Sequence, residues 1–194
     1  MKRAIFFLLL FVILCQFASA QRRGHSGIEF KHDGGISAPY AMMEDYAFTG
    51  GGLTYFPRVN LMVINEDVAC SFGAHLTAGV IFDVEAPDSY DSQTAFMYEA
   101  PIHLDFNFGT RATDQNRETF GGFFGLGYAI SSIENPNLED EAISNNASGG
   151  YLHGGLRFGE SPNAFSLEVY TILGQNNVNV YGVRMLLGIG LFQQ

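Results

Sequence analysis

Residues 96–109 read FMYEAPIHLDFNFG, and this stretch decides the fold class. Its even positions carry Phe, Tyr, Ala, Ile, Leu, Phe and Phe, whereas its odd positions carry Met, Glu, Pro, His, Asp, Asn and Gly. Successive side chains of a β-strand point to opposite faces, so the alternation predicts a strand with one apolar and one largely polar face. A strand of this kind separates two different media.

The same two-residue period recurs along the chain. It predicts eight strands, at about residues 26–32, 51–64, 68–84, 94–110, 118–132, 149–159, 164–173 and 178–192. After residue 20 the sequence holds no run of 18 apolar residues and no long amphipathic helical pattern, so helical membrane spans are not expected. Pro57 and Pro101 each remove a ladder hydrogen bond, so we expect a distortion near them.

The predicted connections alternate in length. Short turns are expected at residues 65–67, 111–117 and 160–163, longer loops at residues 33–50, 85–93 and 133–148, and a short final connection at 174–177. In an antiparallel up-and-down barrel, this order places the short turns at one rim and the longer loops at the other. The pattern therefore predicts an all-β, eight-stranded transmembrane β-barrel with short periplasmic turns and longer extracellular loops.

The number of large apolar residues decides which face points outward. The apolar-face positions of the eight strands carry 38 of them. An eight-stranded barrel has an interior just wide enough to be filled by side chains or to hold one small ligand, so this set would overfill it. We therefore expect the apolar face to contact lipid and the polar face to line the lumen.

The polar face is rich in glycine and carries charges of both signs. Its members form a predicted polar network in the lumen, in which opposite charges pair and thereby lower the cost of their burial: Glu29, Lys31, Arg58, His75, Glu99, His103, Asp105, His153, Arg157, Glu168 and Arg184. A filled, charge-paired interior also implies a closed barrel without an open pore.

The first twenty residues have the pattern of a secretory signal peptide. Lys2 and Arg3 precede an apolar run from Ala4 to Leu14, and residues 18–20 (ASA) form a cleavage site. We therefore predict a signal peptide at 1–20 and a barrel domain at 21–194. Cleavage leaves 8 basic and 20 acidic residues, and this acidity argues against a nucleic-acid partner.

Three stretches resemble small outer-membrane β-barrels of Gram-negative bacteria: residues 100–109 (APIHLDFNFG), 121–128 (GGFFGLGY) and 183–192 (VRMLLGIGLF). The chain is similar to the eight-stranded OmpX and OmpA transmembrane-domain class, and to the outer-membrane β-barrel domain proteins of Bacteroidetes. The resemblance implies contact with outer-membrane lipids and lipopolysaccharide, and insertion by the barrel-assembly machinery. The family usually ends on an aromatic residue, whereas Gln193 and Gln194 follow Phe192 here.

The resemblance leaves the activity open. We expect a non-enzymatic barrel with a structural, adhesive or partner-docking role through its acidic loops, and no cofactor; the extracellular partner is unknown. One alternative is a lipid A-modifying enzyme, with His32, Asp33 and Ser37, or Ser148 and His153, as candidate residues. Another is a secreted, lipocalin-like barrel that binds a hydrophobic ligand. The acidic loops, which include Asp33, could also bind Ca²⁺ through carboxylates, although they lack an EF-hand pattern.

Overall fold

The computed structural model describes residues 29–43, 46–83, 94–134, 147–174 and 178–189. Within them, one antiparallel sheet holds β1 (Phe30–Met43), β2 (Tyr46–Asn65), β3 (Val68–Ala74), β4 (Leu76–Asp83), β5 (Thr94–Gly109), β6 (Phe120–Glu134), β7 (Gly149–Phe158), β8 (Phe165–Gly174) and β9 (Asn179–Gly188). The predicted signal peptide lies outside the described residues. No helix in the described part of the chain is long and apolar enough to cross a membrane.

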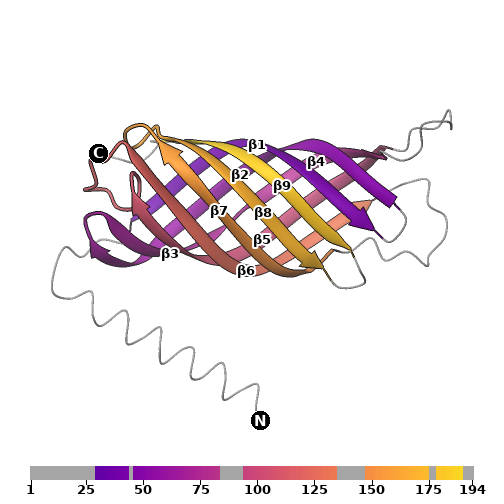
Figure 1. Ribbon diagram of the computed structural model, residues 1–194, viewed down its shortest axis with the longest axis horizontal. Helices are drawn as coiled ribbons and strands as arrows, with labels where there is room; N and C mark the ends of the chain where they lie inside the picture. The colour runs from indigo at the N-terminus through magenta and orange to yellow at the C-terminus, as the bar shows by residue number, and fades with distance from the viewer. Residues whose placement is uncertain (1–28, 44–45, 84–93, 135–146, 175–177, 190–194) are drawn as a thin grey trace, which may run out of the picture.

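The sheet closes on itself into a barrel of tilted strands (Figure 1). β1 pairs with β2 on one side and with β9 on the other, and Asp33 at the start of β1 faces Gly188 at the end of β9. The chain therefore enters and leaves the barrel at the same end, which we call the terminal end. At the opposite end, which we call the distal end, β1, β4, β6 and β8 end and β2, β5, β7 and β9 begin.

β3 and β4 act as one strand that is interrupted at His75. Val68 on β3 faces Phe108 and Thr77 on β4 faces Glu99, so the register with β5 does not slip across the interruption. The His75 N–H donates to the Pro101 carbonyl oxygen at 3.1 Å, but Pro101 has no N–H with which to return the bond. The expected distortion at Pro101 is therefore present, and the nine strands correspond to eight crossings of the barrel.

The predicted loop at residues 33–50 is wrong, because β1 continues to Met43 and β2 begins at Tyr46. Glycines in this stretch allow close packing between strands. A Cβ atom at Gly35 would overlap the carbonyl oxygen of Met185 on β9. The other predicted strands lie within a few residues of the observed ones.

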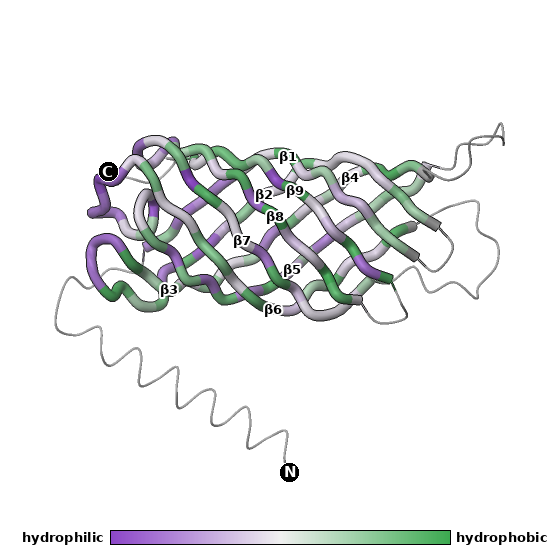
Figure 2. The backbone as a smooth tube through the Cα atoms, in the orientation of Figure 1, coloured by the Kyte–Doolittle hydropathy of each residue, from purple (hydrophilic) through white to green (hydrophobic). Residues whose placement is uncertain are grey.

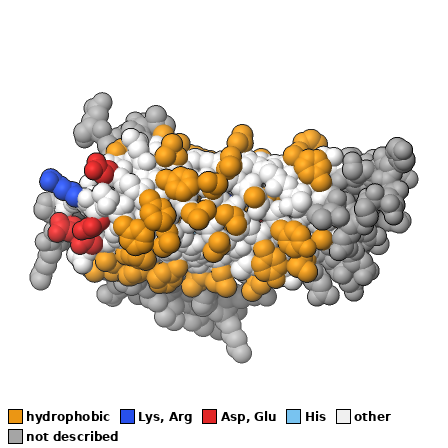
Figure 3. Space-filling model, turned by 45° about the horizontal axis from the view of Figure 1, so that its top comes forward, with side chains coloured by type: hydrophobic (Ala, Val, Ile, Leu, Met, Phe, Trp, Pro, Cys, Tyr) orange, Lys and Arg blue, Asp and Glu red, His pale blue; other side chains and the backbone are white. Residues whose placement is uncertain are grey.

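Apolar side chains cover the outside of the barrel. Figure 2 shows the alternation along the strands, and Figure 3 shows hydrophobic side chains spread over the barrel wall, with charged groups at the terminal end. Among the residues that the structure describes, thirty-two large apolar side chains are exposed, including Phe96, Leu126 and Val169 at more than 60% of their surface. The arrangement is the reverse of a soluble protein, in which such residues form the core.

The lumen itself has two kinds of filling. Near the distal end, inward-facing apolar residues form a compact core, which the sequence analysis did not anticipate: Ala41, Phe48, Ile81, Ala95, Met97, Ala129, Ile133, Ala147, Tyr151, Tyr170, Ile172, Val178 and Val180. Toward the terminal end the filling becomes polar and charged. Side chains thus fill the interior along the described length of the barrel.

Candidate polar site in the barrel lumen

The structure places ten of the eleven residues of the predicted network in the buried interior, and Glu29 is half-buried. They fall into two groups. The central cluster holds His75, Glu99, His103, Asp105, Tyr151, His153, Glu168, Tyr170 and Arg184. The terminal-end cluster holds Glu29, Lys31, Asp33, Arg58, Asn60, Asn107, Arg111, Asp114 and Arg157.

Arg184 on β9 organises one side of the central cluster. Its Nη2 is 2.9 Å from Glu99 Oε2 on β5, and its Nη1 is 2.8 Å from Glu168 Oε1 on β8. The guanidinium also lies 3.6 Å from the ring centroid of Tyr170, whose hydroxyl donates to Glu99 at 3.0 Å. Nη1 donates to the Tyr151 hydroxyl at 2.6 Å as well. One cation therefore joins two carboxylates on different strands, in a site that excludes water.

Three histidines and Asp105 form the other side of the central cluster. Asp105 Oδ1 is 2.6 Å from His103 Nδ1 and 2.8 Å from His153 Nε2. His103 Nε2 is in turn 3.1 Å from His75 Nδ1. Gly125 on β6 leaves the space for this arrangement, because a Cβ atom there would overlap Asp105 Oδ1 and His153 Nε2. Asp105 thus orients two imidazole rings directly and the third through His103.

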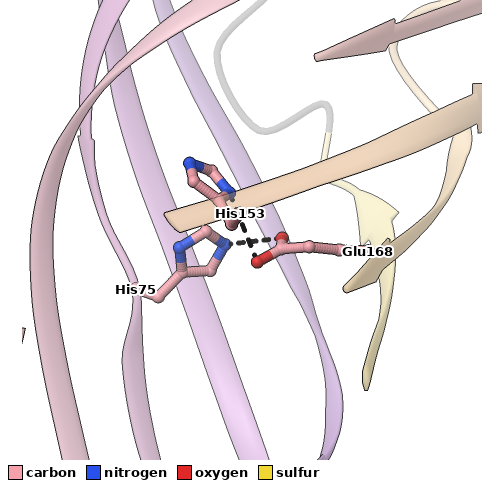
Figure 4. A group of neighbouring side chains, drawn as sticks. All are labelled: His75, His153 and Glu168. Carbon is pink, nitrogen blue, oxygen red and sulfur yellow. Dashed lines mark ion pairs between the residues drawn. The ribbon is translucent and has the colours of Figure 1, made fainter. Parts of the chain in front are cut away.

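Glu168 connects the two sides of the central cluster. His75 Nε2 lies 3.1 Å from Glu168 Oε2, and His153 Nδ1 lies 3.3 Å from Glu168 Oε1. Figure 4 shows both imidazole rings directed at this carboxylate from different parts of the barrel wall. Two sets of three residues here have the composition and spacing to hold a metal ion: His75, His153 and Glu168, and His103, Asp105 and His153.

Arginines dominate the terminal-end cluster. Arg58 donates from Nη1 to Asn107 Oδ1 and from Nη2 to the Arg111 carbonyl oxygen. Arg157 Nη2 donates to the same Asn107 oxygen at 2.9 Å, and its guanidinium lies 4.2 Å from the Phe123 ring centroid. Asn107 therefore separates two cations that would otherwise repel each other in the interior.

Part of the connection between β5 and β6 folds into the terminal end of the lumen. We call residues 110–116 the plug. Arg111, which has a positive φ of 61°, places Nη2 at 2.9 Å from Asp33 Oδ1. Asn60 Nδ2 donates to the Ala112 carbonyl oxygen at 2.8 Å, and Lys31 forms an ion pair with Asp114. The predicted turn at 111–117 therefore also closes the terminal end of the lumen.

The candidate catalytic residues of the first strand do not come together. His32 lies on the outer side, where Nδ1 is 2.5 Å from the Tyr55 hydroxyl. Asp33 and Ser37 are buried, and they contact Arg111 and Tyr170. The placement of Asp33 in a Ca²⁺-binding loop is wrong, because it lies in β1 and forms an ion pair in the interior. The remaining loop carboxylates lie outside the described residues or, for Glu134, have no described side chain.

Several members of the site are absent from the predicted network. Tyr151 and Tyr170 share strand faces with His153 and Glu168, so the two-residue period could have found them. Asn107 likewise follows His103 and Asp105 on one face of β5. Arg111 could not have been found in this way, because it lies beyond the end of a strand, where the period no longer applies.

No protein-family model matches the chain, and no curated protein matches its sequence. Solved structures do match. Ail, the attachment invasion locus protein of Yersinia pestis, in complex with the heparin analogue sucrose octasulfate, gives a TM-score of 0.57 at 14% identity, over 84% of this chain and 98% of that one. Neisserial surface protein A gives 0.58 at 13% identity, over 84% of this chain and 99% of that one. Both are eight-stranded outer-membrane barrels, so the predicted fold class is confirmed.

Proposed function

We propose that this chain is an integral outer-membrane β-barrel protein of a Gram-negative bacterium. In this proposal it is exported by a signal peptide at residues 1–20, inserted by the barrel-assembly machinery, and held by contacts with membrane lipids and lipopolysaccharide. One observation carries the proposal: the large apolar side chains face outward while ion pairs lie in the interior. Apolar groups outside and charges inside are favourable where the surrounding medium is hydrocarbon.

The proposed role is non-enzymatic, and the barrel is closed. Three successive levels of the lumen support closure: the apolar core near the distal end, the central cluster, and the terminal-end cluster with the plug. A solute that crossed the barrel would have to displace all three. We therefore infer that the protein presents a surface and does not conduct.

The segments at the distal end supply that surface. Residues 44–45, 84–93, 135–146 and 175–177 together hold eight acidic residues and no lysine or arginine. Ail was crystallised with a sulfated heparin analogue, but an acidic surface repels a polysulfate and attracts a cationic partner. The proposed function is accordingly docking or adhesion to a partner with a basic surface.

Membrane fractionation and electrophoresis test the location. The protein should sediment with outer membranes and migrate differently in unheated and boiled samples, since a folded barrel resists detergent. Recovery from the periplasm or medium, without a heat-dependent shift, contradicts the proposal and favours the lipocalin-like alternative. Reconstitution into planar bilayers tests closure, and large steady conductances would contradict it.

Two further measurements test the role. Purified protein in nanodiscs should bind a polylysine-coated surface and should not bind immobilised heparin. A variant that combines the charge-neutralising substitutions Glu139→Gln, Asp140→Asn and Glu141→Gln should bind polylysine more weakly. Lipid A mass spectra from a deletion strain and its parent should be identical, and a difference that the intact gene reverses would favour the enzymatic alternative.

A further inference from the structure

We propose that His75, His153 and Glu168 bind one divalent transition-metal ion, with Zn²⁺ as the best match, inside the lumen. The site would join three parts of the wall: the point between β3 and β4, β7, and β8. Two imidazoles and one carboxylate form a common set of protein ligands for Zn²⁺, and they leave a fourth position for a water molecule.

The ligand atoms lie near the spacing that this ion sets, with His75 and His153 approaching different oxygens of Glu168. Zn²⁺ holds nitrogen and oxygen ligands at about 2.0–2.2 Å in a tetrahedron, which sets those ligands about 3.3–3.6 Å apart. His75 Nε2 and Glu168 Oε2 are 3.1 Å apart, and His153 Nδ1 and Glu168 Oε1 are 3.3 Å apart. One ligand atom from each of the three residues lies within 4.8 Å of the others.

The orientation of these atoms separates them from an ordinary hydrogen-bonded cluster. His75 Nε2, His153 Nδ1 and Glu168 Oε2 are buried, and their contacts are ion pairs among these three residues and not well-aligned hydrogen bonds. Buried polar atoms without hydrogen-bond partners are uncommon and call for an explanation such as an ion. The two imidazoles attract the carboxylate electrostatically, and an ion between them would occupy all three ligand atoms.

In the second set, His103, Asp105 and His153, hydrogen bonds already occupy one carboxylate oxygen and two ring nitrogens. Asp105 Oδ1 already forms hydrogen bonds with His103 Nδ1 and His153 Nε2. Those bonds instead support the first set, because a metal-binding histidine usually donates its other ring N–H to a carboxylate or a similar group. Here His153 contacts Asp105 directly, and His75 contacts it through His103.

The charge of the interior also favours a cation. With neutral imidazoles, the central cluster holds three carboxylates (Glu99, Asp105 and Glu168) and one guanidinium (Arg184), for a net charge of −2. The terminal-end cluster holds four cations and three carboxylates, and it offsets only one of these charges. Burying uncompensated charge is costly; a divalent cation among the imidazoles would offset it, as protons on the imidazoles would in its absence.

Refolding of the full chain, without an affinity tag, tests the proposal. Because both ends of the lumen are filled, the ion should enter during folding and then exchange slowly. Protein refolded into detergent with ZnCl₂, then washed with EDTA, should retain one zinc per chain by mass spectrometry of the metal. It should also unfold at a higher temperature than protein refolded with EDTA throughout. Zinc below one tenth per chain would overturn the proposal.

Variants and spectroscopy identify the ligands. His75→Gln, His153→Gln and Glu168→Gln should each lower the retained zinc at least tenfold, whereas His32→Gln, which changes a histidine on the outer side, should retain the wild-type amount. Equal zinc in all four variants would overturn the assignment. If a ligand variant does not fold, X-ray absorption of the wild type decides: a shell of nitrogen and oxygen at about 2.0–2.1 Å with two imidazoles supports the site, and a sulfur shell contradicts it.

Discussion

At the scale of single residues, Arg184 is the one arginine of the central cluster, and its guanidinium lies between Glu99 and Glu168. Arg184→Leu leaves both carboxylates without this partner in a buried site, so we expect it to lower the free energy of unfolding by about 3–5 kcal/mol. Denaturant unfolding of the protein in lipid vesicles measures the change. Arg117→Leu, which removes an exposed arginine, is the control and should change the stability little.

Gly125 offers a second test of the central cluster. Gly125→Ala introduces a Cβ atom that would overlap Asp105 Oδ1 and His153 Nε2. We expect a loss of about 1–3 kcal/mol, which is typical of overpacking in a close-packed interior. The matched control is Gly150→Ala on β7, where a Cβ atom would meet nothing within 4 Å. Equal unfolding midpoints for the two variants would show that the Asp105 contacts are not close-packed.

The alternation of polar and apolar residues was sufficient to place His103, Asp105 and Arg184 on one side of the sheet. It could not identify their partners. Arg184 and Glu99 are 85 positions apart in sequence, and their contact depends on the barrel circumference and on the register of every strand between them. Two residues can pair across a lumen only when the barrel is closed. The pattern within one strand holds no information about closure.

At the scale of elements, Arg58 is one of several wall residues that hold the plug. Its Nη2 donates to the Arg111 carbonyl oxygen, and hydrogen bonds from charged groups contribute about 1.5–3 kcal/mol each. Arg58→Met should therefore increase amide hydrogen exchange in residues 110–116 by at least tenfold and leave β7 and β8 protected. Arg117→Met, on the same connection, should leave the exchange unchanged. Faster exchange throughout the barrel would show that Arg58 stabilises the whole fold and not the plug.

The elements themselves were predictable where large side chains alternate, as in β5 and β6. β1 was not, because residues 34–39 read GGISAP and lack a row of large apolar side chains. Small residues there permit close contact with β9, as at Gly35. For the same reason, the sequence pattern did not predict the apolar core near the distal end. Ala41, Ala95 and Ala129 are too small to mark a face, but they are fully buried.

At the scale of the whole molecule, the outer surface distinguishes a membrane barrel from a soluble one. Leu126 lies near the middle of β6 and is 64% exposed, whereas Phe158 lies at the terminal end of β7 and is 44% exposed. In a bilayer, arginine costs about 2–4 kcal/mol at the midplane and about 0–1 kcal/mol near the interface. Leu126→Arg should therefore destabilise the protein much more than Phe158→Arg.

Both variants can be unfolded with guanidinium in lipid vesicles and compared with the parent chain. The expected order follows from depth alone, because both substitutions place the same charge on the outer face. Water around the barrel would remove the difference, since an exposed surface position tolerates arginine within about 0.5 kcal/mol. Equal stabilities of the two variants, together with solubility without detergent, would reverse the assignment of the apolar surface to lipid. A difference of about 2 kcal/mol or more would place Leu126 in the hydrocarbon.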